Sequence, residues 1–251
     1  MRLSEFFERY VFVRKCVSCN ERLGYEHKDE AFCNACRISW ERAKADICPE
    51  CLRSMSDCRC IPNSLSKAGA LELRKLVAYR KSCASHPENK LIYFLKHRNS
   101  KRAALFSANQ LLYKVDELIA ANEERKEEII LTYLPRSKRA YAKYGVDQAK
   151  LVCETLSDIS GIRSLPLIKR KKSGRSEQKA LDVKRRMINS KDIFEINEDH
   201  ADVFEDNFSV ILFDDVVTSG ASMKAAVRLL RHRGIKNIYA LSIAYTVKEK
   251  S

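Results

Sequence analysis

The spacing of apolar residues predicts alternating helices and strands from residue 71 onward. Apolar side chains recur every three or four positions, as on the buried face of a helix, in residues 88–98, 103–119, 146–160 and 221–233. Short apolar runs that are typical of buried strands lie at 129–131, 165–168, 193–196, 210–213 and 238–244. Residues 71–80 fit either element, and we favour a strand. Alternating strands and helices predict an α/β fold, with a mostly parallel sheet covered on both faces.

The first 60 residues follow another pattern, in which cysteine replaces large apolar side chains. Eight of the ten cysteines form three CxxC pairs and one CxC pair: Cys16, Cys19, Cys33, Cys36, Cys48, Cys51, Cys58 and Cys60. Pairs of thiolates on short turns suit tetrahedral Zn²⁺, which would replace the missing core. We therefore predict a cysteine-rich (double) zinc-ribbon module in residues 1–64 and an α/β domain in residues 65–251.

The pairing of these cysteines has more than one solution. Sequential pairing places the first four cysteines in one zinc site and the last four in a second, whereas interleaved pairing would mix them. The second site is the less regular, because its last pair is shortened to CxC. His27 could replace a thiolate, although a surface histidine is the simpler interpretation. Disulfides are the rival to zinc. Since no position is left open for water, we expect one or two structural ions.

Composition excludes several classes of protein. The 251 residues include 45% hydrophobic residues, which is too many for a disordered chain. No apolar stretch approaches the roughly 18–20 residues of a membrane span. The charged N-terminal segment lacks the apolar core of a secretory signal, so we expect a cytoplasmic protein. The formal charge of +14 suggests an anionic partner.

Residues 210–222, VILFDDVVTSGAS, form the most informative motif. A buried strand is followed by Asp214 and Asp215 at its carboxyl end, where open α/β sheets bind ligands. Small and hydroxyl-bearing residues then precede a helix, whose free N–H groups can bind phosphate. Two carboxylates suit a neutral diol or Mg²⁺, and a ribose phosphate combines these features. The alternative is an ordinary strand–turn–helix, in which Thr218 or Ser219 only caps the helix.

This motif resembles the phosphoribosyl pyrophosphate loop of type I phosphoribosyltransferases. Together with the cysteine-rich module, it resembles the ComF family, which is associated with natural competence and DNA uptake. Further similar motifs are Leu-Lys-His-Arg at 95–98, Leu-Pro-Arg-Ser-Lys-Arg at 134–139, Tyr-Gly-Val-Asp-Gln-Ala at 144–149, and Gln178, Leu181, Arg186 and Asn189. The family's Arg-Gly-Phe-Asn-Gln is Tyr-Gly-Val-Asp-Gln here, so an arginine is missing and an amide has become a carboxylate.

The resemblance implies a type I phosphoribosyltransferase fold that binds phosphoribosyl pyrophosphate with Mg²⁺. Asp214 and Asp215 would hold the ribose diol. The residues implied to bind the ribose 5-phosphate moiety are Asp214, Asp215, Val216, Thr218, Ser219, Gly220, Ala221 and Ser222. Three basic residues after strand 129–133 could face the pyrophosphate or form a solvated turn: Arg136, Lys138 and Arg139. The acceptor substrate is not identified by any motif.

Residues 169–191 concentrate ten basic and two acidic side chains. In the superfamily a flexible loop covers the active site, and this segment occupies its place, so it could close over pyrophosphate. It could also contact a nucleic acid backbone, or remain a solvated run of charge. Two functions stay open. One is a phosphoribosyltransferase, and the other is a non-catalytic protein that binds single-stranded DNA or competence proteins through this segment.

Overall fold

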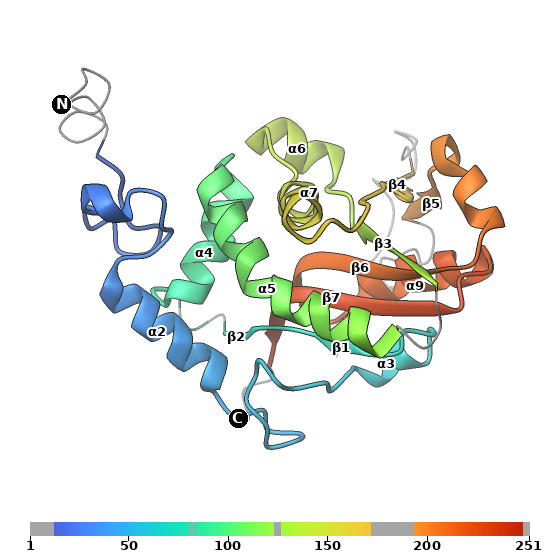
Figure 1. Cartoon of the computed structure of the whole chain (residues 1–251), viewed down its shortest axis with the longest axis horizontal. Coiled ribbons are helices and arrows are strands. Elements are labelled where there is room, and N and C mark those ends of the chain that lie inside the picture. The colour runs from blue at the N-terminus through green and yellow to red at the C-terminus, as the bar shows by residue number, and fades with distance from the viewer. Residues whose placement is uncertain (1–12, 81, 83, 123–126, 172–192, 248–251) are drawn as a thin grey trace, which may run out of the picture.

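A computed structural model of the chain describes residues 13–80, 82, 84–122, 127–171 and 193–247 (Figure 1). Its α-helices are α2 (Asn34–Ala45), α3 (Asn63–Ser66), α4 (Pro87–His97), α5 (Lys101–Asn122), α6 (Lys138–Tyr144), α7 (Gln148–Ser160) and α9 (Ala221–His232). Its strands are β1 (Leu73–Arg74), β2 (Val77–Tyr79), β3 (Glu128–Tyr133), β4 (Ile168–Arg170), β5 (Phe194–Ile196), β6 (Phe208–Val217) and β7 (Asn237–Thr246). Short 3₁₀ turns are η2 (Tyr25–His27), η5 (Glu198–His200) and η6 (Asp202–Glu205).

Five strands form one parallel sheet at the centre of the molecule. The order is β1-β7-β6-β3, and β2 follows β1 along the same edge of β7. Leu212 of β6 lies opposite Ala240 of β7 on one side and Thr132 of β3 on the other. The predicted α/β fold with a mostly parallel sheet is confirmed.

Helices cover both faces of this sheet, which explains why its strands are continuous apolar runs. Successive residues of β6 belong to different buried clusters. Ile211 and Phe213 pack in the cluster that includes residues of α4, α5 and α7. Val210 and Leu212 pack in the cluster that includes residues of α9. In Figure 1, α5 and α7 accordingly lie on the opposite side of the sheet from α9.

One predicted strand, residues 165–168, departs from expectation. Around Leu165 the chain only touches the edge of β3, where Leu131 donates its N–H to Arg163 O and accepts from Leu165 N, both at 2.9 Å. Pro166 then interrupts the contact, because proline has no N–H for a ladder. The regular strand β4 begins at Ile168 and pairs antiparallel with β5, outside the central sheet.

The cysteine-rich segment packs against the α/β part instead of standing apart from it. Helix α2, which the sequence analysis did not predict, buries Trp40 completely. The Trp40 ring lies 5.4 Å from the ring of Phe106 on α5, and its Nε1 donates to Gln110 Oε1 at 3.0 Å. The two parts therefore share one buried cluster. The domain boundary at residues 64 and 65 stays a prediction.

None of the helices in the described residues has the length and hydropathy that a membrane span requires.

Candidate functional site

The two acidic residues of the central motif lie inside β6, near its carboxyl end. The sequence predicted that this strand ends at Phe213, but it continues to Val217. The neighbouring strand is the reason, because β7 is ten residues long and pairs Ala244 with Val216 and Tyr245 with Val217. Backbone pairing thus fixes the chain directly before and after the two carboxylates.

Asp215 is buried, and it forms an ion pair with Lys96 of helix α4. Its Oδ2 lies 3.2 Å from the ammonium nitrogen of Lys96, in the last turn of α4. The carboxyl group is 5% exposed, so water screens this pair weakly. The sequence analysis placed Lys96 in a family-like motif but gave it no role. A basic residue at the end of an amphipathic helix was the available signal.

Asp214 has a less favourable environment. Its Oδ1 accepts the N–H of Asp215 at 3.0 Å. Burial, and then the negative charge of Asp215, raise the pKa of Asp214 well above its ordinary value, while Lys96 opposes the shift. The charged form of such a carboxyl group is stabilised when a cation or a hydroxyl donor approaches it. Binding of such a ligand would therefore stabilise the charged form of Asp214.

The chain turns into α9 directly after β6. Thr218 and Ser219 are exposed, and Gly220 adopts φ +72°, a left-handed conformation that favours glycine. The Ser219 hydroxyl lies 3.4 Å from the N–H of Ala221. The first N–H groups of a helix have no partner within the helix. With the helix dipole, they make this turn suitable for an anionic group.

The Arg136 side chain bonds to the backbone of two neighbouring segments. Its Nη1 donates to Lys96 O at 2.8 Å and to Val146 O at 2.9 Å. Its guanidinium also lies 4.9 Å from the ring centroid of Tyr144. The side chain thus links the end of α4 to the turn between α6 and α7. Lys138 and Arg139 are exposed in the first turn of α6. The role of these three residues toward pyrophosphate stays a prediction.

Asp147, where the family motif has asparagine, has a clear local role. Its Oδ1 accepts the N–H of Lys150 at 3.2 Å, which caps α7. Its Oδ2 accepts the N–H of Arg136 at 2.8 Å. Tyr144, where the family motif has arginine, packs its ring edge-on against His97 at 4.5 Å. Both departures from the motif contribute to the packing of α4, α6 and α7.

Arg170, the last residue of β4, is a second cation whose charge acts on Asp214. Its Nε donates to Pro135 O at 2.8 Å, and its guanidinium lies 5.0 Å from the ring centroid of Phe194. Burial lowers the pKa of Arg170, while the charges of Asp214 and Asp147 act in the opposite direction. Of the basic segment 169–191, only the first three residues are described; the remainder lies outside the described residues.

The eight clustered cysteines form two groups that follow sequence order. One contains Cys16, Cys19, Cys33 and Cys36, and the other contains Cys48, Cys51, Cys58 and Cys60. Within each group all four sulfur atoms lie within 4.8 Å of one another, and all eight are free thiols. The sulfur atoms of Cys19 and Cys33 are 3.6 Å apart. Sulfur atoms around tetrahedral zinc lie about 3.8 Å apart, given Zn–S bonds of about 2.3 Å. Both tetrads therefore fit a four-coordinate metal ion.

The first CxxC pair of each tetrad lies on the same kind of turn. In both turns the residue after the second cysteine has a positive φ, 63° at Asn20 and 59° at Leu52. The N–H of that residue donates to the first cysteine's carbonyl, Cys16 O at 3.1 Å or Cys48 O at 2.9 Å. His27 belongs to neither tetrad and pairs with Glu30 at 3.3 Å. Two copies of the same cysteine-bearing turn are thus present, one in each tetrad.

Comparison with known proteins assigns no family to the chain. No family model matches the sequence. No curated protein matches it either. Among solved structures, one similar chain belongs to the "structure of the allosteric regulatory enzyme of purine biosynthesis", with 12% identity and a TM-score of 0.36. The match covers 60% of this chain and 30% of that chain. A TM-score of this size is too low to assign a fold.

Proposed function

We propose that the chain binds a ribose 5-phosphate ligand, namely phosphoribosyl pyrophosphate together with Mg²⁺, at the carboxyl end of β6. The proposed fold is that of the type I phosphoribosyltransferases, and the proposed family is ComF. The proposed activity is pentosyl transfer to an acceptor that is not identified. A role in natural competence and DNA uptake, and partners such as single-stranded DNA and competence proteins, belong to the same proposal through the family resemblance.

The observation that carries this proposal is the arrangement of residues 214–222. Two adjacent carboxylates near the end of a buried parallel strand precede a left-handed glycine and the start of a helix. The carboxylates can accept hydrogen bonds from the two ribose hydroxyls. The hydroxyls of Thr218, Ser219 and Ser222 and the N–H groups of α9 can bind the phosphate. An ordinary cap would explain the hydroxyls but not two adjacent acidic residues, of which Asp215 is buried.

Electrostatics support a cation-assisted ligand. Asp214 and Asp215 place two acidic groups next to each other, and Lys96 forms an ion pair with Asp215. Oxygen donors of this kind are the ligands that Mg²⁺ prefers, and the ion usually binds through one or two carboxylates plus substrate phosphates. Mg²⁺ would offset negative charge on a departing pyrophosphate.

Zinc is the metal proposed for the two cysteine tetrads. A four-thiolate, four-coordinate donor set is typical of structural zinc. Elemental analysis of purified protein should give two zinc ions per chain. A single zinc ion would contradict one of the two sites, and the absence of zinc would contradict both.

Calorimetric titration with phosphoribosyl pyrophosphate and Mg²⁺ tests the ligand. Binding should be saturable in the wild type and at least about 100-fold weaker in a protein carrying Asp214→Ala and Asp215→Ala, because loss of charge-assisted bonds costs several kcal/mol. Asp199→Ala removes an exposed carboxylate from η5 and is the matched control. Equal affinity in the double variant and the control would contradict the assignment. A pyrophosphate-release assay with candidate acceptors then separates catalysis from binding alone.

A further inference from the structure

Lys75 is a buried cation whose position is unusual. It lies between β1 and β2 and is only 1% exposed. Its ammonium group donates to the backbone carbonyls of two cysteines in the second tetrad, Cys60 O at 2.9 Å and Cys58 O at 3.4 Å. Within the described part of the chain, no carboxylate forms an ion pair with Lys75. A buried charge without a counter-charge costs several kcal/mol, and two carbonyls with the ring of Tyr245, 5.5 Å from the ammonium nitrogen, offset this cost only in part.

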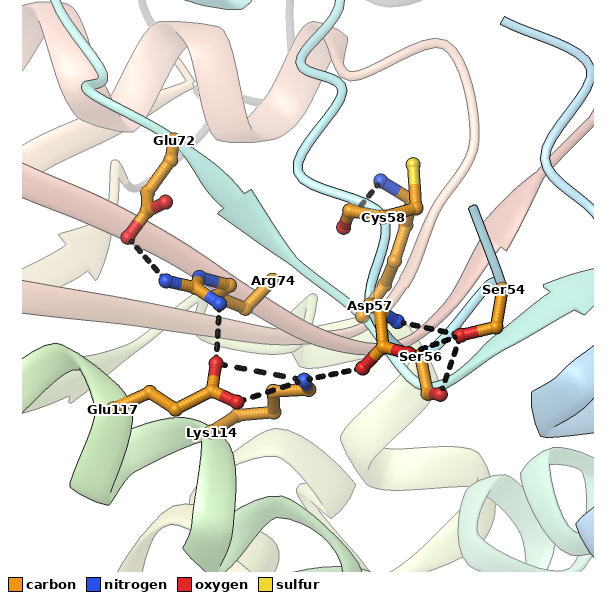
Figure 2. A network of polar contacts seen from close by, with 9 residues as sticks. Ser54, Ser56, Asp57, Cys58, Glu72, Arg74, Lys114 and Glu117 are labelled. Atoms are coloured by element: carbon orange, nitrogen blue, oxygen red, sulfur yellow. Dashed lines mark hydrogen bonds and ion pairs between the residues drawn. The ribbon is translucent and has the colours of Figure 1, made fainter. Parts of the chain in front are cut away.

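Two other buried cations nearby have acidic partners, which makes Lys75 distinct. Lys114 is also 1% exposed, and it lies 3.4 Å from Glu117 and 3.6 Å from Asp57. Arg74 pairs with Glu72 at 3.2 Å and also with Glu117. Figure 2 shows this chain of acid–base contacts running from Glu72 to Asp57, with Cys58 directly beside it. Lys75 faces the cysteine backbone instead.

The first tetrad has an equivalent basic side chain. Arg102, near the start of α5, donates from Nη2 to Lys15 O at 2.6 Å and from Nη1 to Lys28 O at 3.3 Å. Lys15 directly precedes the first ligand, Cys16. Among the described residues Arg102 also forms no ion pair with a carboxylate. Each cysteine loop therefore binds one cation of the α/β part through its own backbone carbonyls.

A loaded tetrad supplies the missing negative charge. Four thiolates around a divalent ion carry a formal net charge of −2. We propose that Lys75 and Arg102 are positioning residues that compensate this charge, Lys75 at the second tetrad and Arg102 at the first. Each cation then fixes its cysteine loop on the α/β part and stabilises the metal-bound form. This inference rests on the proposed zinc sites.

The test follows zinc loss at each tetrad separately in full-length, zinc-loaded protein. The protein is challenged with EDTA and iodoacetamide, and peptide mapping measures the alkylation rate of each cysteine. In K75M, alkylation of Cys48, Cys51, Cys58 and Cys60 should accelerate about 10- to 100-fold, the usual effect of losing an outer-sphere partner. The other tetrad should change by less than about twofold, since it lies outside that partner's shell. R102M should show the opposite selectivity.

Variants that conserve charge, and a buried control, separate compensation from general loosening. K75R and R102K should restore most of the wild-type rate. K114M removes an equally buried ammonium that also contacts the second cysteine loop, through Asp57, but is compensated by carboxylates, so it should accelerate the second tetrad clearly less than K75M does. If K75M accelerates both tetrads equally, or if K114M matches its effect, the inference is wrong. If K75M does not fold, the inference is decided by R102M, because Arg102 is only half-buried. In that case R102M must accelerate the first tetrad selectively, and K75R must alkylate at close to the wild-type rate. Wild-type protein without zinc contradicts the metal sites themselves, whereas two zinc ions with unchanged release in K75M contradicts only this inference.

Discussion

Asp214 and Asp215 are neighbours in the sequence, yet their environments differ. Asp215 has the ammonium of Lys96 at 3.2 Å. For Asp214, burial and the adjacent carboxylate raise its pKa, so its charged form is the disfavoured one. Acidic groups kept in a costly environment are frequent at functional sites, where a ligand relieves the cost. At the residue scale, Asp215 already has a cationic partner, whereas the charge of Asp214 would gain one only from a ligand or a metal ion.

Replacing Asp214 with asparagine should stabilise the free protein at neutral pH. Because the pKa of Asp214 is higher in the folded chain, the unfolded chain loses this proton first as the pH rises. The contribution of Asp214 to the free energy of unfolding is therefore greatest below about pH 4, and it is lost as the pH rises through the folded-state pKa. D214N removes this loss, and we expect a gain of about 0.5–2 kcal/mol at pH 7 in urea unfolding.

The pH dependence provides the check on this prediction. The difference between D214N and the wild type should shrink as the pH approaches 4. D215N is the control, because it removes the partner of Lys96 and should not stabilise the chain. A D214N protein that is less stable than the wild type at pH 7 would show that the Asp214 charge is compensated.

At the scale of elements, the apolar pattern predicted most long helices and the central strands. Where the prediction was wrong, neighbouring elements decided the outcome. Strand β6 extends past Phe213 because β7 continues to pair with it, a contact that no local pattern can reveal. Helix α2 was missed because its residues lie between cysteines that were interpreted only as metal ligands. Its partners, Phe106 and Gln110, are about 70 residues away.

The candidate site was predictable in the same uneven way. Asp214, Asp215 and Gly220 belong to one short segment, residues 214–220, so one stretch of sequence contains their pattern. Lys96, which pairs with Asp215, and Arg170, whose charge interacts with that of Asp214, belong to other elements, and only the fold brings them near. The two cysteine tetrads follow sequence order, which CxxC spacing favours but does not require.

Removing the Asp147 carboxylate should loosen the start of α7. D147A loses the bonds from Lys150 N and Arg136 N, so we expect a cost of about 1–2 kcal/mol in urea unfolding. D147N retains one oxygen acceptor and should cost less than half as much. Equal losses in the two variants would show that charge, and not capping, matters at this position.

The contact between α2 and α5 gives a second prediction at this scale. Gln110 Oε1 accepts both Trp40 Nε1 and Lys44 Nζ at 3.0 Å. Q110L leaves a buried indole N–H without its partner and should cost about 1–3 kcal/mol. Adding W40F to Q110L removes that N–H, so the double variant should lose less than the sum of the two single losses. Strict additivity would contradict coupling through this bond.

For the whole molecule, the shared buried cluster implies that metal binding and folding depend on each other. Trp40 is the only tryptophan and is fully buried where the cysteine-rich segment meets α5. Stripping metal with a chelator under reducing conditions should shift its fluorescence to the red. We expect Tm to fall by about 10 °C or more. Structural zinc contributes several kcal/mol to folding, and each kcal/mol lost lowers Tm by about 2–4 °C. An unchanged emission maximum with full metal loss would contradict this dependence.

The position of β7 also constrains when the molecule can fold. β7 is the last strand in the sequence, but it lies inside the sheet between β6 and the β1–β2 edge. Leu73 pairs with Ala240, so this edge cannot form until the ribosome has released more than 165 further residues. Such long-range parallel pairing slows folding and leaves apolar strand edges exposed in the meantime. A nascent chain would therefore depend on its helices and cysteine loops to cover those edges until β7 has been synthesised.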